Sequence, residues 1–553
     1  MARFYRRKTV SLVMLLLVAP FAEAGFGFGG PAAIIANAVT DSRADGGSRL
    51  ETNGNGVWIA SWPRGPVDDE TDVVISRSLD NGATWSAPLA LNANPESDTV
   101  LDINPRLATD GSGNWVAIWV VKVNDDEVNA DYDILVAHSQ DEGATWSAPD
   151  VLSAKADIIA PLGISLLSGT PSPSLATDSA GSWLAVWRTT VPVNSNGDID
   201  LLSSTSTDNG ATWSTPVAVS AANDSFIDAS PRAAATAPGE WMVVWNTIGF
   251  VIANGLHISR SGDNGATWSP PEALISYADS DPVRHNISRI ETGGAGLWVG
   301  IGEYASHDVG ATIPVLTSDY DIFLIRSEDN GETWSGPRPL LEKPGRDFKD
   351  DVIPVLTTDG AGSWLAAWTS QRPVKANADS DISASFSRDD GLSWTPVVGL
   401  NSNASIDHGN DSFPGIRTDG EGNWVAVWSS NNLLDENTAD LDTDIHAARS
   451  TFTLGDKLII LTPNGGERIK PGKKTRIEWL SIGGIGDQVS LSVFRDGEAV
   501  SVIKESTAND GVYRWNVPES LAPGNGYKVK VQSVENPTQT DRSDRRFRIR
   551  ASR

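Results

Sequence analysis

The chain of 553 residues contains no cysteine, so no disulfide bond stabilises any part of it. Tyrosine occurs only seven times and methionine three times. Long apolar runs are also missing after residues 10–18, so no membrane span is expected in the mature chain. A chain of this length can bury a large core, and its stability is expected to come from that core.

Basic residues are outnumbered by acidic ones, 43 against 71, which gives a net charge of −28. The imbalance lies in residues 1–455, with 26 Lys and Arg against 59 Asp and Glu, whereas residues 456–553 carry 17 against 12. A body this acidic repels phosphate backbones and anionic headgroups. Nucleic acid and anionic membranes are therefore not expected as ligands.

The first residues have the three parts of a secretory signal. A basic stretch (Arg3, Arg6, Arg7 and Lys8) precedes the apolar residues 10–18, and Ala22-Glu23-Ala24 is a small-x-small cleavage site. This order predicts a signal peptide over residues 1–24 and a protein that is secreted or held in the cell envelope. A membrane anchor is the alternative, but the apolar run is short for a bilayer.

Six copies of one motif recur, reading SLDNGATW, SQDEGATW, STDNGATW, SGDNGATW, SEDNGETW and SRDDGLSW. They end at Trp85, Trp146, Trp213, Trp268, Trp334 and Trp394, at intervals of 55–67 residues, which is room for four strands. Two apolar runs around a Gly/Asp/Ser turn precede the motif, as in PRLATDGSGNWVAIW from Pro105, and indicate a hairpin. A third apolar segment comes directly before the motif, and a fourth comes directly after it. Each period therefore predicts a four-stranded antiparallel blade of a β-propeller.

Seven hairpins can be counted, which predicts an all-β fold with a seven-bladed propeller over residues 25–455. The seventh blade lacks the motif and a fourth strand after residues 444–452. An open ring would leave an exposed edge, so a strand from elsewhere should complete this blade. Ala33–Val39, just before the first blade, is the best candidate.

The aspartate of each motif is expected to be structural. Its carboxylate can accept hydrogen bonds from the amides of its own turn, while the glycine supplies a positive φ and the Thr or Ser a hydroxyl. No nucleophile stands beside a base in the motif. The six aspartates are Asp80, Asp141, Asp208, Asp263, Asp329 and Asp389.

Pairs of tryptophans four residues apart recur in the hairpins, as in Trp115 and Trp119. This spacing puts both rings on one face of a strand. The rings could be platforms on which sugars stack, but recurrence in nearly every blade favours packing between neighbouring blades.

A second acidic pattern opens the third strand of most blades. Its members are Asp131 and Asp133, Asp198 and Asp200, Asp319 and Asp321, Asp379 and Asp381, and Asp442 and Asp444. Further aspartates recur in the loops between blades, which leave from the same end of the ring. Oxygen-rich loops suit calcium, so calcium is the one cofactor predicted. The alternative is a solvated acidic rim that keeps the protein soluble.

Four arginines occupy equivalent positions at the start of innermost strands, namely Arg49, Arg106, Arg232 and Arg289. They could line the axial mouth and clamp a carboxylate of an acidic sugar by paired donors. The alternative is that they neutralise the acidic loops.

The motif within four-stranded blades resembles the Asp-box repeat of the sialidase-like superfamily, over about Arg49 to Phe452. In that family the motif lies away from the active site. True sialidases are six-bladed and use an arginine triad, a Tyr/Glu pair and an aspartic acid, with the first arginine two residues before a proline. Here Ile103 stands two before Pro105, and only Glu303-Tyr304 is similar to the pair. The resemblance implies the fold more than the reaction.

Residues 456–553 show short alternating runs between Gly, Pro and Asn turns, which predict a small β-sandwich. PNGGE from Pro463, IEW from Ile477, YRWNVP from Tyr513 and LAPGNGYKVKV from Leu521 resemble the immunoglobulin-like module of fungal cell-wall-synthesis and secreted bacterial proteins. This resemblance implies attachment or spacing at a surface. Its excess of Lys and Arg could dock on the acidic propeller or on an anionic envelope polymer, and both remain open.

Together these patterns predict a secreted, monomeric recognition protein that binds a glycan or a surface protein without catalysis. The alternative is an exo-sialidase or related glycoside hydrolase acting on acidic sugars, which would need two suitably spaced carboxylates. A structural surface-layer component, with neither ligand nor reaction, is the third possibility.

Overall fold

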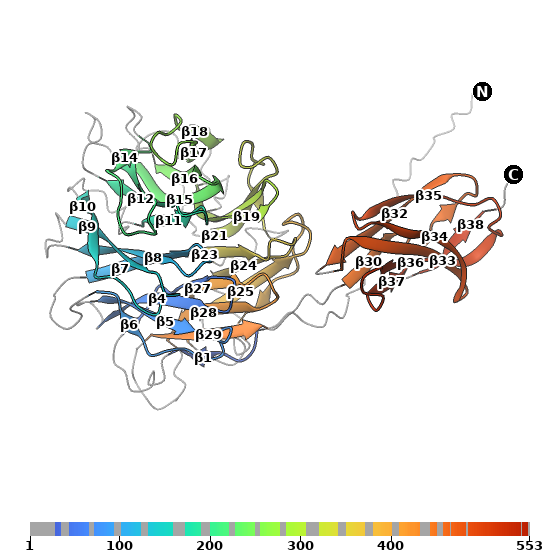
Figure 1. Ribbon diagram of the computed structural model, residues 1–553, viewed down its shortest axis with the longest axis horizontal. Helices are drawn as coiled ribbons and strands as arrows, with labels where there is room; N and C mark the ends of the chain where they lie inside the picture. The colour runs from blue at the N-terminus through green and yellow to red at the C-terminus, as the bar shows by residue number, and fades with distance from the viewer. Residues whose placement is uncertain are drawn as a thin grey trace, which may run out of the picture.

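A computed structural model gives the structure of the chain. It describes residues 28–34, 44–65, 71–92, 101–122, 131–158, 172–189, 199–220, 227–248, 255–276, 284–305, 320–340, 350–370, 380–400, 409–431, 443–450 and 457–550, the last without 465, 483–484 and 544. All 38 regular elements are β-strands (Figure 1). Among these residues there is no helix with the length and apolar character that a membrane crossing requires.

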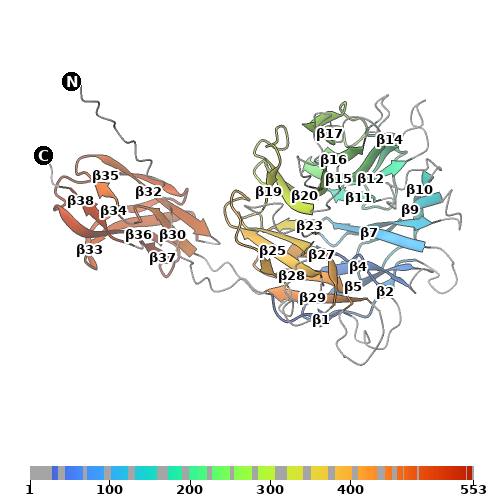
Figure 2. The ribbon, with the colours of Figure 1, turned by 180° about the vertical axis from the view of Figure 1, so that it is seen from behind.

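Between residues 32 and 450 the described chain forms seven antiparallel sheets, one after another (Figure 2). Each sheet has an innermost, a second, a third and a fourth strand. The innermost strands are β3 (Arg49–Thr52, preceded by β2, Ala44–Asp45), β7 (Leu101–Thr109), β11 (Ser174–Thr177), β15 (Ile227–Ala237), β19 (Arg284–Gly294), β23 (Asp351–Thr358) and β27 (Asp411–Thr418). The second strands are β4 (Trp58–Gly65), β8 (Trp115–Lys122), β12 (Trp183–Thr189), β16 (Glu240–Ile248), β20 (Leu297–Ala305), β24 (Trp364–Ser370) and β28 (Trp424–Ser430).

The outer two strand positions complete each sheet. The third strands are β5 (Asp72–Ser78), β9 (Asp131–Ser139), β13 (Asp200–Ser206), β17 (Gly255–Ser261), β21 (Tyr320–Ser327), β25 (Asp381–Ser387) and β29 (Asp444–Ser450). The fourth are β6 (Leu89–Ala90), β10 (Asp150–Ile158), β14 (Val217–Ala218), β18 (Glu272–Ser276), β22 (Arg338–Pro339), β26 (Val398–Gly399) and β1 (Ala32–Ala33).

The innermost strands form a closed ring. Each contacts the next in the order β3, β7, β11, β15, β19, β23, β27, and β27 contacts β3 again. The last sheet is completed by β1, where Ala32 pairs with Ala447 and Ala33 with His446, and the Ile34 amide donates to the Ile445 carbonyl at 2.8 Å. The expected closing strand is therefore present, but it begins one residue earlier than Ala33. Residues 35–39 of the expected strand lie outside the described residues.

The core lies between neighbouring sheets rather than inside a single one. Twelve tryptophans of the second strands are fully buried, for example Trp115 and Trp119, and each cluster joins the strands of two successive sheets. Each ring buries on the order of 200 Å² of surface. The tryptophan pairs are thus packing residues, and none of the twelve offers an exposed face to a sugar.

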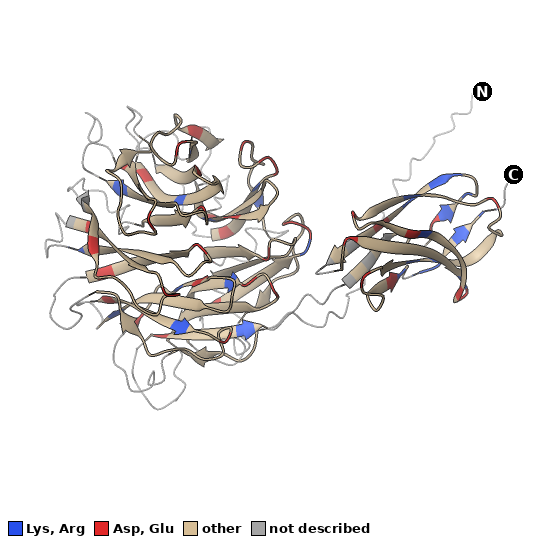
Figure 3. Cartoon of the chain, in the orientation of Figure 1, with Lys and Arg blue, Asp and Glu red and all other residues tan. Residues whose placement is uncertain are grey.

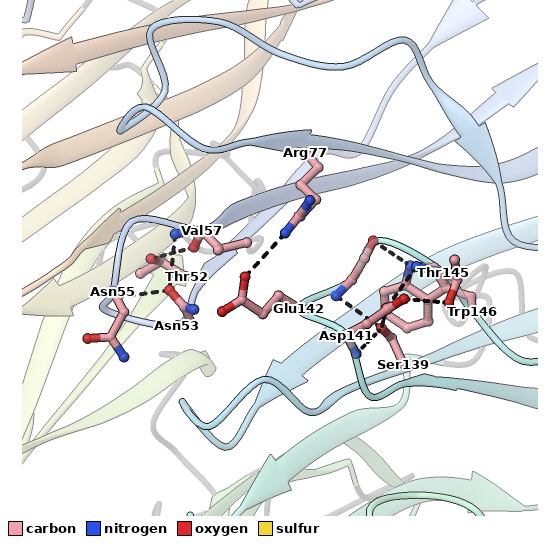
Figure 4. A network of polar contacts seen from close by, with 11 residues as sticks. Thr52, Asn53, Asn55, Val57, Arg77, Ser139, Asp141, Glu142, Thr145 and Trp146 are labelled. Carbon is pink, nitrogen blue, oxygen red and sulfur yellow. Dashed lines mark hydrogen bonds and ion pairs between the residues drawn. The ribbon is translucent and has the colours of Figure 1, made fainter.

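The Asp-box turns have the predicted hydrogen bonds. In the second sheet, Asp141 Oδ1 accepts from the Ser139 hydroxyl and the Thr145 amide, both at 2.8 Å, and Asp141 Oδ2 accepts from the Thr145 hydroxyl at 2.6 Å (Figure 4). These bonds hold the pKa of the Asp141 carboxyl down at about 2. The same bonds recur at Asp80, Asp208, Asp263, Asp329 and Asp389.

Residues 457–550 form the predicted β-sandwich, drawn in orange and red in Figure 1. One sheet has the order β30 (Lys457–Thr462), β32 (Lys474–Ile482), β35 (Val512–Asn516). The other has the order β31 (Arg468–Ile469), β38 (Phe547–Ile549), β36 (Gly524–Ser533), β33 (Gln488–Arg495), β34 (Glu498–Ala508), with β37 (Thr540–Arg542) also paired to β36. A separate core of seventeen buried residues, including Trp479 and Trp515, lies between the sheets.

Candidate functional site

A cavity of about 380 Å³ lies on the propeller axis and is lined by the innermost strands of all seven sheets. A ring of strands makes such a cavity because each innermost strand turns alternate side chains toward the axis. Ligand cavities in proteins are typically about 300–1,000 Å³, so a sugar residue fits the available space.

The four arginines of the sequence pattern share one level of this cavity. Arg49, Arg106, Arg232 and Arg289 pair across the hairpin with Ser61, Ile118, Val244 and Ile301 at the same register. The other three strands carry Ser174, Val355 and Gly415 at that register. The guanidinium groups therefore come from the first, second, fourth and fifth sheets and leave the rest of the rim small or apolar.

Bulges set the direction of these side chains in several strands. Asn104 and Ser230 have φ values of 53° and 54°, and the strand register shifts between them and the arginines that follow, Arg106 and Arg232. An extra residue in one strand re-aims the side chains after it. Ile353 and Phe413 have the same conformation in β23 and β27, and strain of this kind gathers near functional sites.

Three charged residues of the cavity escaped the sequence analysis. Glu51, Glu291 and Arg417 lie two residues beyond the arginine level, each immediately before a threonine at or near the end of the innermost strand. Aligning the seven hairpins on that threonine would have found them, since the equivalent residues elsewhere are alanine or threonine.

These three residues and Arg289 form one ion-pair cluster. Arg417 donates to both oxygens of Glu51, with Nε to Oε2 at 2.8 Å, and its Nη1 lies 3.7 Å from Glu291 Oε1. Arg289 lies 2.7 Å from Glu291 and 3.3 Å from Glu51. Two cations thus offset two anions, and the cluster as a whole is neutral.

The remaining three arginines have no carboxylate partner among the described residues. Arg49 Nη1 donates to the Ser48 carbonyl at 2.9 Å, and Arg106 donates to the Pro105 carbonyl at 2.9 Å and to the Ser172 hydroxyl at 3.0 Å. Arg232 donates to the carbonyls of Ser288 and Pro231 at 2.5 and 2.8 Å. Neutral acceptors satisfy some of their N–H groups but leave three positive charges in the cavity.

Burial and mutual repulsion make these charges unfavourable in the empty cavity. Burial and the charge of Arg289 lower the pKa of Arg49 to about 10, and burial lowers the pKa of Arg232 to about 10 as well. Burial and three neighbouring arginines lower the pKa of Arg106 well below its usual range. An arginine stays protonated in proteins, so burial of these charges without an ion-pair partner favours an anion here.

The glutamates respond in the opposite sense. Burial raises the pKa of Glu51 to about 7, against the opposing charge of Arg289. Burial also raises the pKa of Glu291, and Arg289 opposes this shift. For Arg289, burial lowers the pKa, but Glu291 and Glu51 outweigh it and raise the value.

Glu303 lies in β20 and is not among the lining residues. Its carboxylate accepts from the Ile353 amide at 2.9 Å and from Asn286 Nδ2 at 3.3 Å, and burial raises its pKa. The Tyr304 ring stacks on His285 at 5.2 Å. The two neighbours in sequence therefore point to different surroundings, as expected for a strand, and do not form a catalytic pair.

The predicted calcium residues are placed only in part. Asp198, Asp319, Asp379 and Asp442 lie outside the described residues. Asp131, Asp133, Asp200, Asp321, Asp381 and Asp444 lie in third strands, and none of them lines the cavity. No group of three His, Cys, Asp or Glu side chains in the described ranges is arranged to hold a metal ion. Calcium therefore stays a prediction.

Comparison with known proteins gives partial matches. Residues 462–549 match the family model of the Kre9/KNH-like N-terminal Ig-like domain. A sialidase of Paraclostridium sordellii is 28% identical in an alignment of 157 residues. The match covers 25% of this chain and 37% of the length of that sialidase.

Some solved structures are similar to the chain at low sequence identity. The NanB sialidase of Streptococcus pneumoniae is 12% identical, with a TM-score of 0.40 over 74% of this chain and 69% of that one. A polysaccharide lyase that acts on ulvan is 13% identical, with a TM-score of 0.46, and the match covers 76% of this chain and 93% of the lyase. The chain thus consists of a β-propeller with Asp-box turns, followed by a domain that matches the Kre9/KNH-like N-terminal Ig-like domain.

Proposed function

We propose that the protein is a secreted recognition protein whose axial cavity binds an acidic sugar of a glycan without cleaving it. The observation that carries this proposal is the set of three partly buried guanidinium groups, of Arg49, Arg106 and Arg232, that form no ion pair within the described residues. A carboxylate or sulfate on the ligand would supply the missing charge through paired hydrogen bonds.

The distribution of charge supports an anion over a neutral ligand. Five arginines and two glutamates reach the cavity, and both glutamates are already held by Arg289 and Arg417. Desolvated charges of one sign are costly unless a partner arrives, so binding an anion would recover much of the cost. The match to a sialidase over 157 residues supports a sugar as the carrier of that anion.

The position of the carboxylates supports binding without catalysis. A glycosidase of the usual kind needs one carboxyl group as an acid and a second as a base or nucleophile. Glu51 and Glu291 are instead bound by guanidinium groups in the same cluster. They line the cavity, but their charges are already paired with Arg289 and Arg417.

A glycoside hydrolase is the second candidate. The observation in its favour is the raised pKa of Glu51, about 7, because a carboxyl that keeps its proton near neutral pH can act as a general acid. The sialidase match agrees with this candidate too.

The test is calorimetric binding of N-acetylneuraminate and galacturonate to the full chain, with lactose as the neutral control, with and without calcium. Arg106→Ala should weaken binding of the acids at least about tenfold, because a charged hydrogen-bond donor is lost. Arg77→Ala is the matched control, since Arg77 pairs with Glu142 outside the cavity. Equal binding by wild type and Arg106→Ala would reject the proposal.

Hydrolysis is measured in parallel with sialyl and uronyl chromogenic substrates. We expect no turnover. Turnover that disappears in Glu51→Gln would instead establish the glycoside hydrolase. Weaker binding after calcium removal would support a calcium site in the loops that carry the paired aspartates.

A further inference from the structure

The outward face of the larger sheet of the sandwich carries a row of cations. In β36, Tyr527, Val529 and Val531 are buried in the core, so Lys528 and Lys530 point outward. The same alternation applies to β31, β37 and β38. Ile469, Ser543 and Phe547 are buried at these strands, and the basic residues next to them in sequence point outward. We call these residues the cationic strip: Arg468, Lys528, Lys530, Arg542 and Arg548.

Strand pairing brings members of the strip directly opposite one another. Lys530 pairs with Arg542 across β36 and β37, and Arg468 pairs with Arg548 across β31 and β38. Neighbouring strands lie about 4.8 Å apart, and like charges directly opposite each other destabilise a sheet. Burial and the charge of Arg542 lower the pKa of Lys530, which shows the crowding.

The exposed acidic residues in the described strands of this sheet, Glu498 and Glu505, lie in its edge strand β34. The outward positions of β31, β33, β36, β37 and β38 carry no acidic residue. Arg468, Lys530, Arg542 and Arg548 form no ion pair within the described ranges. Arg542 instead lies over the ring of Phe494, 4.1 Å from its centroid, which fixes the guanidinium on the surface.

We propose that the cationic strip is a binding surface for an anionic polysaccharide, separate from the axial cavity. Alternate residues on a strand lie about 6.8 Å apart and neighbouring strands about 4.8 Å apart, so the strip presents charges at the spacing of an extended sugar chain with an acid on successive units. Figure 3 shows the Lys and Arg residues of the sandwich in blue. The proposal does not depend on what the axial cavity binds.

A polysaccharide fits this surface better than the protein's own propeller does. Many carboxylates of the described propeller are inside the sheets, among them Asp102, Asp200, Asp228, Asp351 and Asp411, so they cannot meet an exposed surface. A flexible polyanion can reach all five cations. The repulsion between opposed like charges in this sheet is relieved when a polyanion lies across them.

The experiment measures binding of the full chain to immobilised alginate at low and moderate salt, with neutral dextran as the control polymer. The strip variant is Lys530→Gln with Arg542→Gln. The matched variant is Arg476→Gln with Arg514→Gln, which removes the same charge from an opposed pair on the other sheet. All chains also carry Arg106→Ala. This substitution weakens anion binding in the axial cavity, so a further loss of alginate binding is assigned to the strip.

We expect the strip variant to bind alginate roughly tenfold more weakly at low salt. The matched variant should bind nearly as well as its parent, and added salt should weaken the parent most. The melting temperature of the strip variant should change little, because the loss of the repulsion between Lys530 and Arg542 offsets the loss of the contact between Arg542 and Phe494. Equal losses in both variants would show a general charge effect and overturn the proposal. Unchanged binding in the strip variant would also overturn it, and would leave the propeller or another protein as the partner.

Discussion

At the scale of single residues, Glu51 controls the charge of the axial cavity. It accepts hydrogen bonds from Arg417 and lies 3.3 Å from Arg289. Burial raises its pKa from 4.5 to about 7, so the folded chain keeps this proton at pH values where the unfolded chain has lost it. The folded state therefore binds more protons between these two values, and this group makes the free energy of unfolding fall as the pH rises through that window.

The same proton should tune anion binding. Below about pH 7 Glu51 becomes neutral and no longer offsets the arginines, so the affinity for N-acetylneuraminate should increase several-fold from about pH 8 to about pH 6. Calorimetry at both values checks this. Glu51→Gln should bind tightly and with little dependence on pH. The same dependence in the variant and the wild type would show that another group is responsible.

At the scale of elements, the Asp-box turn connects each sheet to the one before it. The glycine of every box faces a side chain of the preceding sheet, and an added Cβ at Gly143 would lie 2.2 Å from Cδ1 of Ile59 in β4. At Gly210 the neighbour is Val116 of β8, at 2.5 Å. The glycine is thus required twice, for its positive φ and for the close approach of the preceding sheet. Arg77 and Glu142 form an ion pair across the same junction, at 3.4 Å (Figure 4).

A pair of glycine variants separates these two requirements. Gly113→Ala tests positive φ alone, since φ is 103° and the nearest atom lies at 3.7 Å, and it should cost about 1 kcal/mol. Gly143→Ala adds the clash with Ile59 and should cost about 1–3 kcal/mol more. Denaturant unfolding measures both. An equal loss of unfolding free energy in both variants would mean that Ile59 moves away from the added methyl group without destabilising the fold.

At the scale of the whole molecule, the two ends of the propeller meet in one sheet. β1 pairs with β29 although more than 400 residues separate them in the sequence, and Ile34 is buried with Leu50, Val425 and Ile445. This pairing satisfies the edge of the last sheet and fixes the diameter of the ring. The arginines from four different sheets can face one cavity only if the ring is closed.

Removing the closing contact should therefore destabilise the propeller. Ile34→Ala deletes a side chain that is only 6% exposed and should lower the free energy of unfolding by about 2–4 kcal/mol. Ile34→Val, which keeps most of the contact, should cost about 0.5–1.5 kcal/mol. Thermal unfolding and anion binding are measured together. A large loss of affinity in Ile34→Ala, with the chain still folded, would confirm that closure positions the arginines. Unchanged stability would contradict the role of β1.

The sequence alone determined the all-β class, the repeated four-stranded sheets, the Asp-box hydrogen bonds and the sandwich. These features depend on local patterns: alternation along strands, glycine in turns, and a motif repeated every 55–67 residues. It also found Arg49, Arg106, Arg232 and Arg289, because equivalent positions in a repeat face the same way. A closing strand before the first hairpin was predictable from the incomplete last sheet.

Only the tertiary structure decided what these residues face. The ion pairs of Arg289 and Arg417 with Glu51 and Glu291 join strands far apart in the chain, so no local pattern could show that two arginines are neutralised and three are not. The cationic strip likewise depends on which strands pair, since β31 is distant in sequence from β36, β37 and β38. Charge and burial at a site are sums over neighbours that the fold, not the order of residues, brings together.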